Sequence, residues 1–443
     1  DLKAGIRFLK ANDAEMAGDA NKIISIGTSA GGAMSALLGS TGNVSDYDPY
    51  LKEIGAVMDQ TDDVYAAQAY CPITDLYQNL QTYNNSRSGE NGESTDFEKA
   101  VSAQMSSGYV DYINSLKLVD PESGEALNLG EDGRSGSFYN YMVAKVEDAA
   151  TVYLEKISEG SLNVPYTLED YLKGNYTKQG RGGKPGAGQP GDAGKTRDAG
   201  QMADAEKAAT GQPENAGKLG EGQKQKKTGK PENAGKTENA GRIKSETDST
   251  ETRDTGRAVV TEKGTDLSSF LSWDGKQAKI TRLDDYLADY NPRMKTVMAF
   301  DNLEMSENSG ENLEFGDETH QYFHFDSYMP DVLESLKEEF PDEYAKYAEG
   351  YDAVIGDKAL AERKQLLNPL NYIGSEDADT AEHIRIRVGT QDADTALSIS
   401  AVLALSLENK TGADVDYALV WDQPHGDADY DGELVQWIEK ICK

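Results

Sequence analysis

A serine flanked by glycines is the feature of this sequence that points most directly to chemistry. Ser29 lies in the string Gly27-Thr-Ser-Ala-Gly31, which matches the pattern Gly-x-Ser-x-Gly. The apolar run 23–26 before it predicts a buried strand, and residues 30–38 after it predict a helix. A serine on a sharp strand-to-helix turn is exposed for attack on a carbonyl carbon, and the residues two before and two after it must lack bulk. Gly27 and Gly31 meet this requirement. The motif therefore predicts a nucleophilic serine, whereas a glycine-rich turn with a capping serine is the simpler alternative.

A nucleophilic serine needs a base and a donor for the negative charge that develops on the carbonyl oxygen. The first amide of the predicted helix, that of Ala30, is such a donor. The predicted base is His425, one of four histidines, because it lies in a loop directly after the predicted strand 417–421. An exposed loop histidine without a chemical role is the alternative. His383, at the start of another predicted strand, is not expected to take part.

The acid that orients the base is expected in the loop after the predicted strand 384–388. This loop offers two carboxylates, those of Asp392 and Asp394. Asp392 is nearer the strand and is the predicted partner of His425. Asp394 would then face the substrate or cap the helix predicted over residues 394–408. Serine, histidine and aspartate together predict a proton relay at the ends of the strands.

Two other strings are similar to metal sites but do not meet the requirements of one. His320 and His324 are four residues apart and could share a helical face, but no third ligand at a suitable spacing accompanies them. The string Asp427-Ala-Asp-Tyr-Asp-Gly432 matches the start of a calcium loop, but Ile438 stands where that loop requires glutamate. Asp431 is predicted instead to cap the last helix. We expect neither a metal nor a cofactor.

Composition excludes several classes of protein. The 443 residues include 44 Lys+Arg and 78 Asp+Glu, which gives a formal net charge of −34. Such a charge repels phosphates, so nucleic acid and anionic membrane surfaces are not expected partners. No apolar run approaches the roughly 18 residues that a membrane-spanning helix needs. The two cysteines, Cys71 and Cys442, form neither a disulfide framework nor a CxxC zinc site. The composition indicates a soluble, acidic, globular protein.

Strands alternate with helices at both ends of the chain, which predicts an α/β fold with a parallel sheet covered on both faces. Residues 1–74 and 371–443 are the predicted core, and residues 75–370 between them are predicted to be an inserted cap or lid domain. The predicted strands are 23–26, 64–71, 384–388 and 417–421, and the predicted helices are 1–16, 30–38, 138–157, 330–347, 394–408 and 432–442.

Residues 175–258, within the predicted cap, have a different composition. They are rich in glycine, and no aromatic residue occurs between Tyr176 and Phe270. Imperfect repeats of Glu-Asn-Ala-Gly run through them. Such a segment buries too little apolar surface to offset the entropy of ordering it, so we predict that it is disordered. A tether to a wall polymer or to another protein is the functional alternative.

Five longer strings resemble one family, the bacterial tannases, which are α/β-hydrolase serine esterases that split galloyl esters. The resemblance covers nearly all of the chain outside the low-complexity segment. Fungal tannases place cysteines beside the serine and the histidine, and this sequence does not, so the bacterial type is the match. The strings are residues 27–32, 71–76, 368–373, 385–395 and 417–430.

The resemblance implies roles for individual residues. It assigns the catalytic triad to Ser29, Asp392 and His425. It assigns recognition of the gallate ring to Asp394, Lys295 and Glu311, with Glu314 as a rival to Glu311. Carboxylates accept hydrogen bonds strongly from phenolic hydroxyls, and an ammonium group supplements the contacts to the oxygens.

The resemblance also implies that strands of the sheet precede the nucleophilic serine, together with a loop that supplies a second oxyanion donor. The chain begins at the helix before residues 23–26, so we expect it to be a fragment of a longer gene product in which the N-terminal strands are missing. Whether this fragment is active or folds alone stays open, as do its targeting and oligomeric state. An extracellular or cell-envelope location is favoured over a cytoplasmic one.

The predicted function is therefore hydrolysis of galloyl esters, small or polyphenolic, to gallic acid through an acyl-enzyme. A feruloyl-type or general carboxylesterase would keep the same triad and act on a different acyl group. A non-catalytic binding protein on the same scaffold, with the repeat segment as an adhesive tether, is the alternative from another class.

Overall fold

Among the described residues, a parallel sheet of four strands lies at the centre of the fold, in the order β1-β2-β7-β8. The computed structural model describes residues 1–74, 95–179, 261–286 and 329–443, and these belong to one compact unit. The strands of the sheet are β1 (Ile24–Thr28), β2 (Ala66–Tyr70), β7 (His383–Gly389) and β8 (Asp414–Val420). Two antiparallel pairs accompany it, β3 (Thr177–Gln179) with β4 (Thr261–Lys263) and β5 (Leu271–Trp273) with β6 (Ala278–Ile280).

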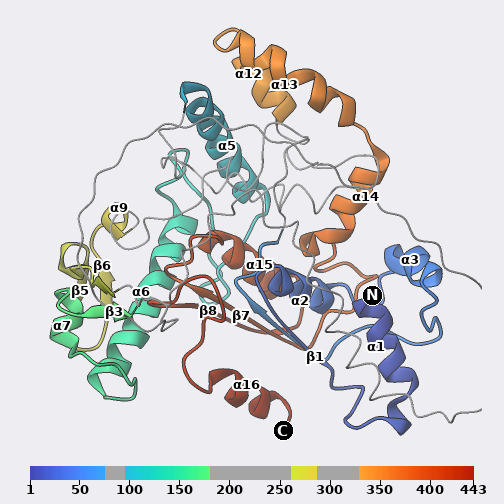
Figure 1. Ribbon diagram of the computed structural model, residues 1–443, viewed down its shortest axis with the longest axis horizontal. Coiled ribbons are helices and arrows are strands. Elements are labelled where there is room, and N and C mark those ends of the chain that lie inside the picture. Colours follow the sequence, from blue (N-terminus) through green and yellow to red (C-terminus); the bar gives the residue numbers. More distant parts are fainter. Residues whose placement is uncertain (75–94, 180–260, 287–328) are drawn as a thin grey trace, which may run out of the picture. The chain divides into compact units, whose positions relative to one another are not determined.

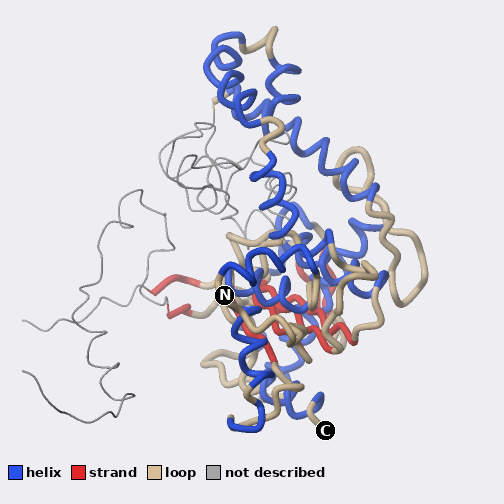
Figure 2. The backbone as a smooth tube through the Cα atoms, turned by 90° about the vertical axis from the view of Figure 1, so that its right-hand side faces the viewer, coloured by secondary structure: helices blue, strands red, loops and turns tan. Residues whose placement is uncertain are grey.

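Helices cover both faces of this sheet, as the alternating pattern predicted (Figures 1 and 2). Helices α2 (Ala30–Ser40) and α15 (Leu397–Lys410) lie on one face, over a core that includes Ala67 and Ile384. Helix α16 (Glu433–Ile441) lies on the other face, where Trp437 packs against Ala66. Successive residues of a strand point to opposite faces, so Ala66 and Ala67 serve different layers. The α/β fold with a parallel sheet is confirmed.

Of the other α-helices that the structure describes, α1 (Leu2–Ala11) and α3 (Asp48–Glu53) lie within the predicted core segment 1–74, and the rest lie within residues 75–370. The rest are α5 (Asp96–Ser115), α6 (Ser137–Ser158), α7 (Leu168–Leu172), α9 (Leu283–Asp285), α12 (Met329–Leu336), α13 (Pro341–Val354) and α14 (Lys358–Leu367). None of the helices in the described part of the chain has the length and apolar character that crossing a membrane would require.

The predicted insertion over residues 75–370 shares packing with the sheet. Helix α6 lies along β8, and its Tyr153 and Leu154 belong to the same buried cluster as Trp421, which follows β8. The indole of Trp421 donates a hydrogen bond of 2.8 Å to the hydroxyl of Tyr171 in α7. The division into core and cap stays a prediction, but this part of the predicted cap helps to form the core beside β8.

The structure differs from the predicted elements at several boundaries. The predicted helix over 330–347 is two helices, α12 and α13, because Pro341 disfavours the helical conformation of Phe340 before it. The predicted helix over 1–16 ends at Ala11. In the predicted disordered segment, residues 177–179 form β3, because Tyr176 before them is buried against other tyrosines. Residues 180–258 lie outside the described residues.

Candidate active site

The turn that carries Ser29 has the strained backbone expected of a nucleophile. Ser29 lies between β1 and α2 with φ 60° and ψ −121°, in a region that side-chain-bearing residues rarely adopt. The turn is tight: a Cβ atom on Gly27 would lie 1.9 Å from the carbonyl oxygen of Gly31. A Cβ atom on Gly32 would lie 2.1 Å from the carbonyl oxygen of Tyr70. The close approach thus requires glycine at positions 27 and 32.

One expectation about this turn is wrong in detail. The motif predicted that position 31 must have a residue without bulk, but a Cβ atom placed on Gly31 would meet no other atom within 4 Å. Ala30 is the first residue of α2 and is exposed. Its amide belongs to the first helical turn, whose N–H groups have no carbonyl partner within the helix. Ala30 therefore lies where an oxyanion donor next to Ser29 is needed.

The structure brings Ser29, His425 and Asp392 together from the ends of three strands. Nε2 of His425 lies 2.9 Å from Oγ of Ser29. Nδ1 of the same ring lies 3.0 and 3.1 Å from the two carboxylate oxygens of Asp392. When Nδ1 carries the proton and donates to Asp392, Nε2 is free to accept the hydroxyl proton of Ser29. The geometry is that of a proton relay.

Of the two candidate acids, Asp392 contacts the imidazole of His425. The backbone amide of Asp394 contacts the carboxylate of Asp392. Asp392 is fully buried, and its Oδ1 also accepts hydrogen bonds of 2.8 Å from the amides of Asp394 and Thr395. Asp394 is half-buried, and α15 begins only at Leu397 without a side-chain cap. The alternative in which Asp394 caps that helix is therefore wrong.

Cys71 is a neighbour of the relay that the sequence analysis missed. Its sulfur lies 3.9 Å from Nε2 of His425 and donates to the carbonyl oxygen of Gly426 at 3.5 Å. Cys71 is buried, has a positive φ of 37°, and follows β2 directly. Its position after a strand adjacent to β1 was the signal available in the sequence, because the ends of neighbouring parallel strands lie at one edge of the sheet.

Cys71, Asp392 and His425 also offer possible metal ligands, whose atoms lie within 4.8 Å of one another. However, the relay already uses both ring nitrogens of His425. Nδ1 contacts the carboxylate and Nε2 contacts Ser29. The geometry therefore favours a proton relay over a metal centre at this position.

The environment of His425 changes its proton affinity. Burial lowers the pKa of the imidazole, but the hydrogen bonds to Asp392 and Cys71 and the carboxylate charge outweigh burial. Together they raise the pKa of His425 from 6.5 to about 10. The protonated ring, the form that follows proton transfer from a serine, is thus strongly stabilised.

Several predicted site residues cannot be placed. Lys295, Glu311 and Glu314, which the resemblance assigned to substrate binding, lie outside the described residues, as do His320 and His324.

The predicted cap of the last helix is wrong: the residue before α16 is Gly432, with φ 84°, and no side chain caps it. The acidic string before α16 therefore needs another explanation.

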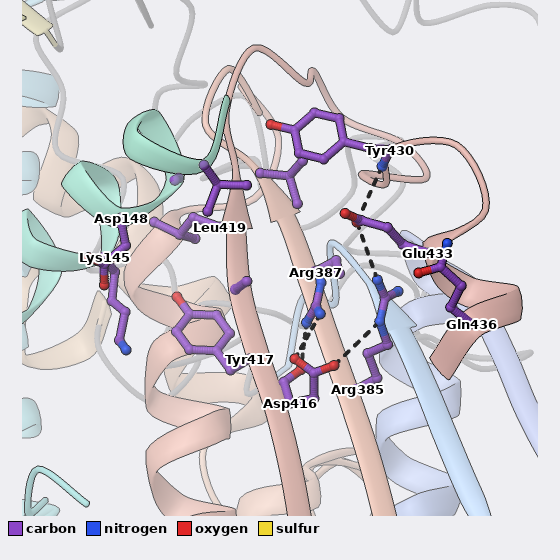
Figure 3. A pocket seen from close by; sticks show the side chains of 14 residues that line it. Lys145, Asp148, Arg385, Arg387, Asp416, Tyr417, Leu419, Tyr430, Glu433 and Gln436 are labelled. Atoms are coloured by element: carbon purple, nitrogen blue, oxygen red, sulfur yellow. Dashed lines mark hydrogen bonds and ion pairs between the residues drawn. The ribbon is translucent and has the colours of Figure 1, made fainter. Parts of the chain in front are cut away.

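A cavity of about 340 Å³ lies beside strand β8, at the edge of the described sheet (Figure 3). Residues of α6, β7, β8 and α16 line it, among them Lys145, Arg385 and Asp416. No residue of the relay contributes to its wall. Its lysine and arginines are matched by nearby carboxylates, so the cavity does not present an excess of either charge.

The chain is similar to known proteins over part of its sequence and over all of its described fold. The BD-FAE family model matches residues 1–123. Among curated proteins, none matches the chain. A tannase from Fusobacterium nucleatum has 28% sequence identity and a TM-score of 0.61, and the alignment covers 100% of this chain and 72% of that one.

A tannin acyl hydrolase from Lactobacillus plantarum, in its native structure, has 27% identity and a TM-score of 0.64. The alignment covers 100% of this chain and 70% of that one. A tannin acyl hydrolase in complex with ethyl gallate has 28% identity, the same coverage and a TM-score of 0.64. The resemblance inferred from the motifs is confirmed: the chain has an α/β-hydrolase fold and is similar to the tannases in both sequence and structure.

Proposed function

We propose that this protein is a serine esterase that hydrolyses galloyl esters to gallic acid. The observation that carries the proposal is the hydrogen-bonded series Ser29–His425–Asp392 on a strained strand-to-helix turn. It is supported by the similarity in fold to a tannin acyl hydrolase whose structure contains ethyl gallate. The substrate is accordingly a small or polyphenolic ester whose acyl group is a trihydroxybenzoate.

In the proposed reaction, Oγ of Ser29 attacks the ester carbonyl carbon while its proton passes to Nε2 of His425. The amide of Ala30 donates to the resulting oxyanion. The intermediate collapses, the alcohol leaves with the proton from His425, and the galloyl group stays on Ser29. A water molecule then gives a proton to Nε2 of His425 and attacks the acyl carbon. When this second intermediate collapses, gallic acid leaves and His425 returns the proton to Oγ of Ser29. Asp392 stabilises the charged imidazole at both stages.

Recognition of the galloyl ring is assigned to Asp394 beside the relay, and to Lys295 with Glu311 or Glu314. Asp394 is half-buried, and its backbone amide donates to the carboxylate of Asp392, which supports a role for this residue close to the relay. The direct test compares kcat/KM for methyl gallate and methyl ferulate. We expect a clear preference for the gallate, because methyl ferulate has one phenolic hydroxyl where methyl gallate has three, so a site built to pair three hydroxyls is left partly unpaired. Equal values would instead favour a general carboxylesterase.

Replacing Asp394 with alanine is expected to reduce kcat/KM for methyl gallate about 10- to 100-fold and to change that for methyl benzoate little. A hydrogen bond to a charged group contributes about 1.5–3 kcal/mol, and methyl benzoate lacks the hydroxyls that would make it. The matched control is Asp431→Ala, which removes an exposed carboxylate of a nearby loop. A parallel loss on both esters would contradict the assigned role of Asp394.

The raised pKa of His425 predicts a dependence of activity on pH. The base must be neutral to accept the proton of Ser29, and a pKa of about 10 leaves most of it protonated at lower pH. We therefore expect kcat/KM to increase as the pH rises above 6.5 and to level off only near the raised pKa. Cys71→Ala removes one contribution to the raised pKa, so its profile is expected to shift to lower pH. A profile that levels off at pH 6.5 would contradict this prediction.

A non-catalytic binding protein on the same scaffold predicts a different result. An active nucleophilic serine reacts covalently with a fluorophosphonate, whereas a serine in a binding site does not. Labelling of Ser29, located by peptide mass spectrometry, would exclude the binding protein without any assumption about the ester substrate.

A further inference from the structure

The face of the sheet under α16 carries charged residues that an interior strand seldom has. In β7 the isoleucines Ile384 and Ile386 point to the apolar layer, while Arg385 and Arg387 point to the opposite face. A strand buried on both faces of a parallel sheet usually consists of apolar residues throughout. Arg385 is only 1% exposed, although β7 lies between β2 and β8. Burial of this charge requires an explanation.

The partner of Arg385 belongs to the loop that carries His425. Nη1 of Arg385 donates to Oδ2 of Asp429 at 3.0 Å, and Nη2 donates to Oδ1 at 2.5 Å. The hydroxyl of Tyr70, in β2, donates to the same carboxylate. Nη1 also donates to the buried side chain of Gln68 at 2.8 Å. Asp429 is thus held from two strands, in a bidentate geometry of high specificity.

Residues 421–432, which we name the histidine loop, must cross the end of the sheet. His425 follows β8, and Ser29 follows β1, with β7 and β2 between them in the sheet. Neighbouring strands are about 4.8 Å apart, so the crossing spans about 14 Å. The loop is attached to each strand that it passes. Arg385 and Tyr70 bind Asp429, and the hydroxyl of Thr28, next to Ser29, donates to Asp427.

The attachment continues into the helix that ends the loop (Figure 3). Glu433, the first residue of α16, lies 3.8 Å from Nη2 of Arg385 and accepts a hydrogen bond of 3.4 Å from the amide of Tyr430. On its other side, Nε of Arg385 lies 3.7 Å from Asp416 of β8. The guanidinium therefore has carboxylates on both sides and lies between β8 and the first turn of α16.

We infer that Arg385 and Asp429 are positioning residues that hold the histidine loop across the sheet and so keep Nε2 of His425 against Oγ of Ser29. The inference rests on the proposed serine chemistry, and neither residue touches the reacting atoms. Replacing a buried ion pair by apolar side chains often leaves stability unchanged. Stability alone therefore does not explain why the pair is present. A role in placing His425 does, because the loop that carries His425 must pass β7 and β2 to reach Ser29.

The test uses the full chain and measures the rate at which Ser29 reacts with a fluorophosphonate, together with kcat and KM for methyl gallate. Asp429→Asn is expected to lower the labelling rate and kcat about 100-fold and to leave KM within about twofold, because a displacement of about 1 Å has effects of this size. Arg385→Lys keeps the charge but loses the bidentate contact, so about a tenfold loss is expected. The matched control, Asp431→Asn in the same loop, should react as the unmodified protein does.

A double variant separates positioning from folding. Arg385→Met with Asp429→Leu leaves no unpaired buried charge, so we expect a cooperative unfolding transition near that of the unmodified protein but a labelling rate still about 100-fold lower. A folded double variant with unchanged labelling would overturn the inference, as would a higher KM at unchanged kcat. If the unmodified protein is labelled but hydrolyses no galloyl ester, the proposed substrate is wrong, and the labelling rates still decide the positioning role.

Discussion

Replacing Ser29 with alanine is expected to lower kcat for methyl gallate by about five to six orders of magnitude. In other triad enzymes, loss of the serine costs about as much as loss of all three residues, because they act as one unit. The described contacts support the same expectation here, because the hydroxyl of Ser29 lies 2.9 Å from Nε2 of His425, whereas the sulfur of Cys71 lies 3.9 Å from it. KM should change little, because the hydroxyl contributes mainly to the transition state.

The measurement needs a control for the strained turn. Alanine at position 29 keeps the backbone but removes the hydroxyl, so fluorophosphonate labelling should vanish while the unfolding transition stays near that of the unmodified protein. Ser25→Ala is the matched control, because Ser25 lies on the same strand and its hydroxyl contacts Ser35 at 2.7 Å instead of the relay. We expect that variant to keep its activity within about threefold. Residual turnover above one per cent in Ser29→Ala would identify a different nucleophile.

The central sheet could be predicted from the sequence because its strands are short apolar runs with turn residues after them. Residues 23–26 and 417–421 were predicted as strands and correspond to β1 and β8 within a few residues. Ends of parallel strands meet at one edge of a sheet, so residues that follow different strands could be expected to converge. This reasoning predicts that Ser29, Asp392 and His425 converge, and in the structure His425 contacts both of the others.

Other features depend on packing that local sequence does not record. The place of Cys71 beside His425 follows from the order β1-β2-β7-β8, and its positive φ has no local signal. The turn requires glycine at position 32 and not at position 31, because the carbonyl oxygen of Tyr70 on the neighbouring strand lies where a Cβ atom on residue 32 would be. Both outcomes depend on a strand about 40 residues away in the sequence.

The acidic string before α16 shows that excluding one role from the sequence leaves the actual role of its residues unknown. The missing glutamate excluded a calcium loop, but helix capping by Asp431 was wrong. Asp427 and Asp429 instead contact side chains on β1, β2 and β7. The alternation of isoleucine and arginine in residues 384–388 predicts a strand, but it does not explain why the two arginines are buried. Basic residues on an interior strand, together with acidic residues in a distant loop, indicate that the two groups form ion pairs, as Arg385 and Asp429 do.

Replacing Asp392 with asparagine is expected to lower kcat by about four orders of magnitude with the fold intact. The amide oxygen of asparagine can still accept the hydrogen bonds that Oδ1 of Asp392 receives from the amides of Asp394 and Thr395, so the loop should keep its conformation. The side-chain NH₂ group, however, cannot stabilise an imidazolium, and it favours the tautomer with the proton on Nε2. That tautomer cannot accept the proton of Ser29, and loss of this orientation costs about 10⁴ in a related triad.

The same variant has a second signature in its pH profile. Asp392 contributes the largest of the interactions that raise the pKa of His425, so its neutral replacement should move the rise of kcat/KM to lower pH. Asp394→Asn removes a charge that is not among the main causes of the raised pKa of His425, so it should leave the rise in place. Measuring both variants from pH 6 to 10 separates orientation from charge. A profile for Asp392→Asn that coincides with that of the unmodified protein would mean that His425 is not the group that titrates.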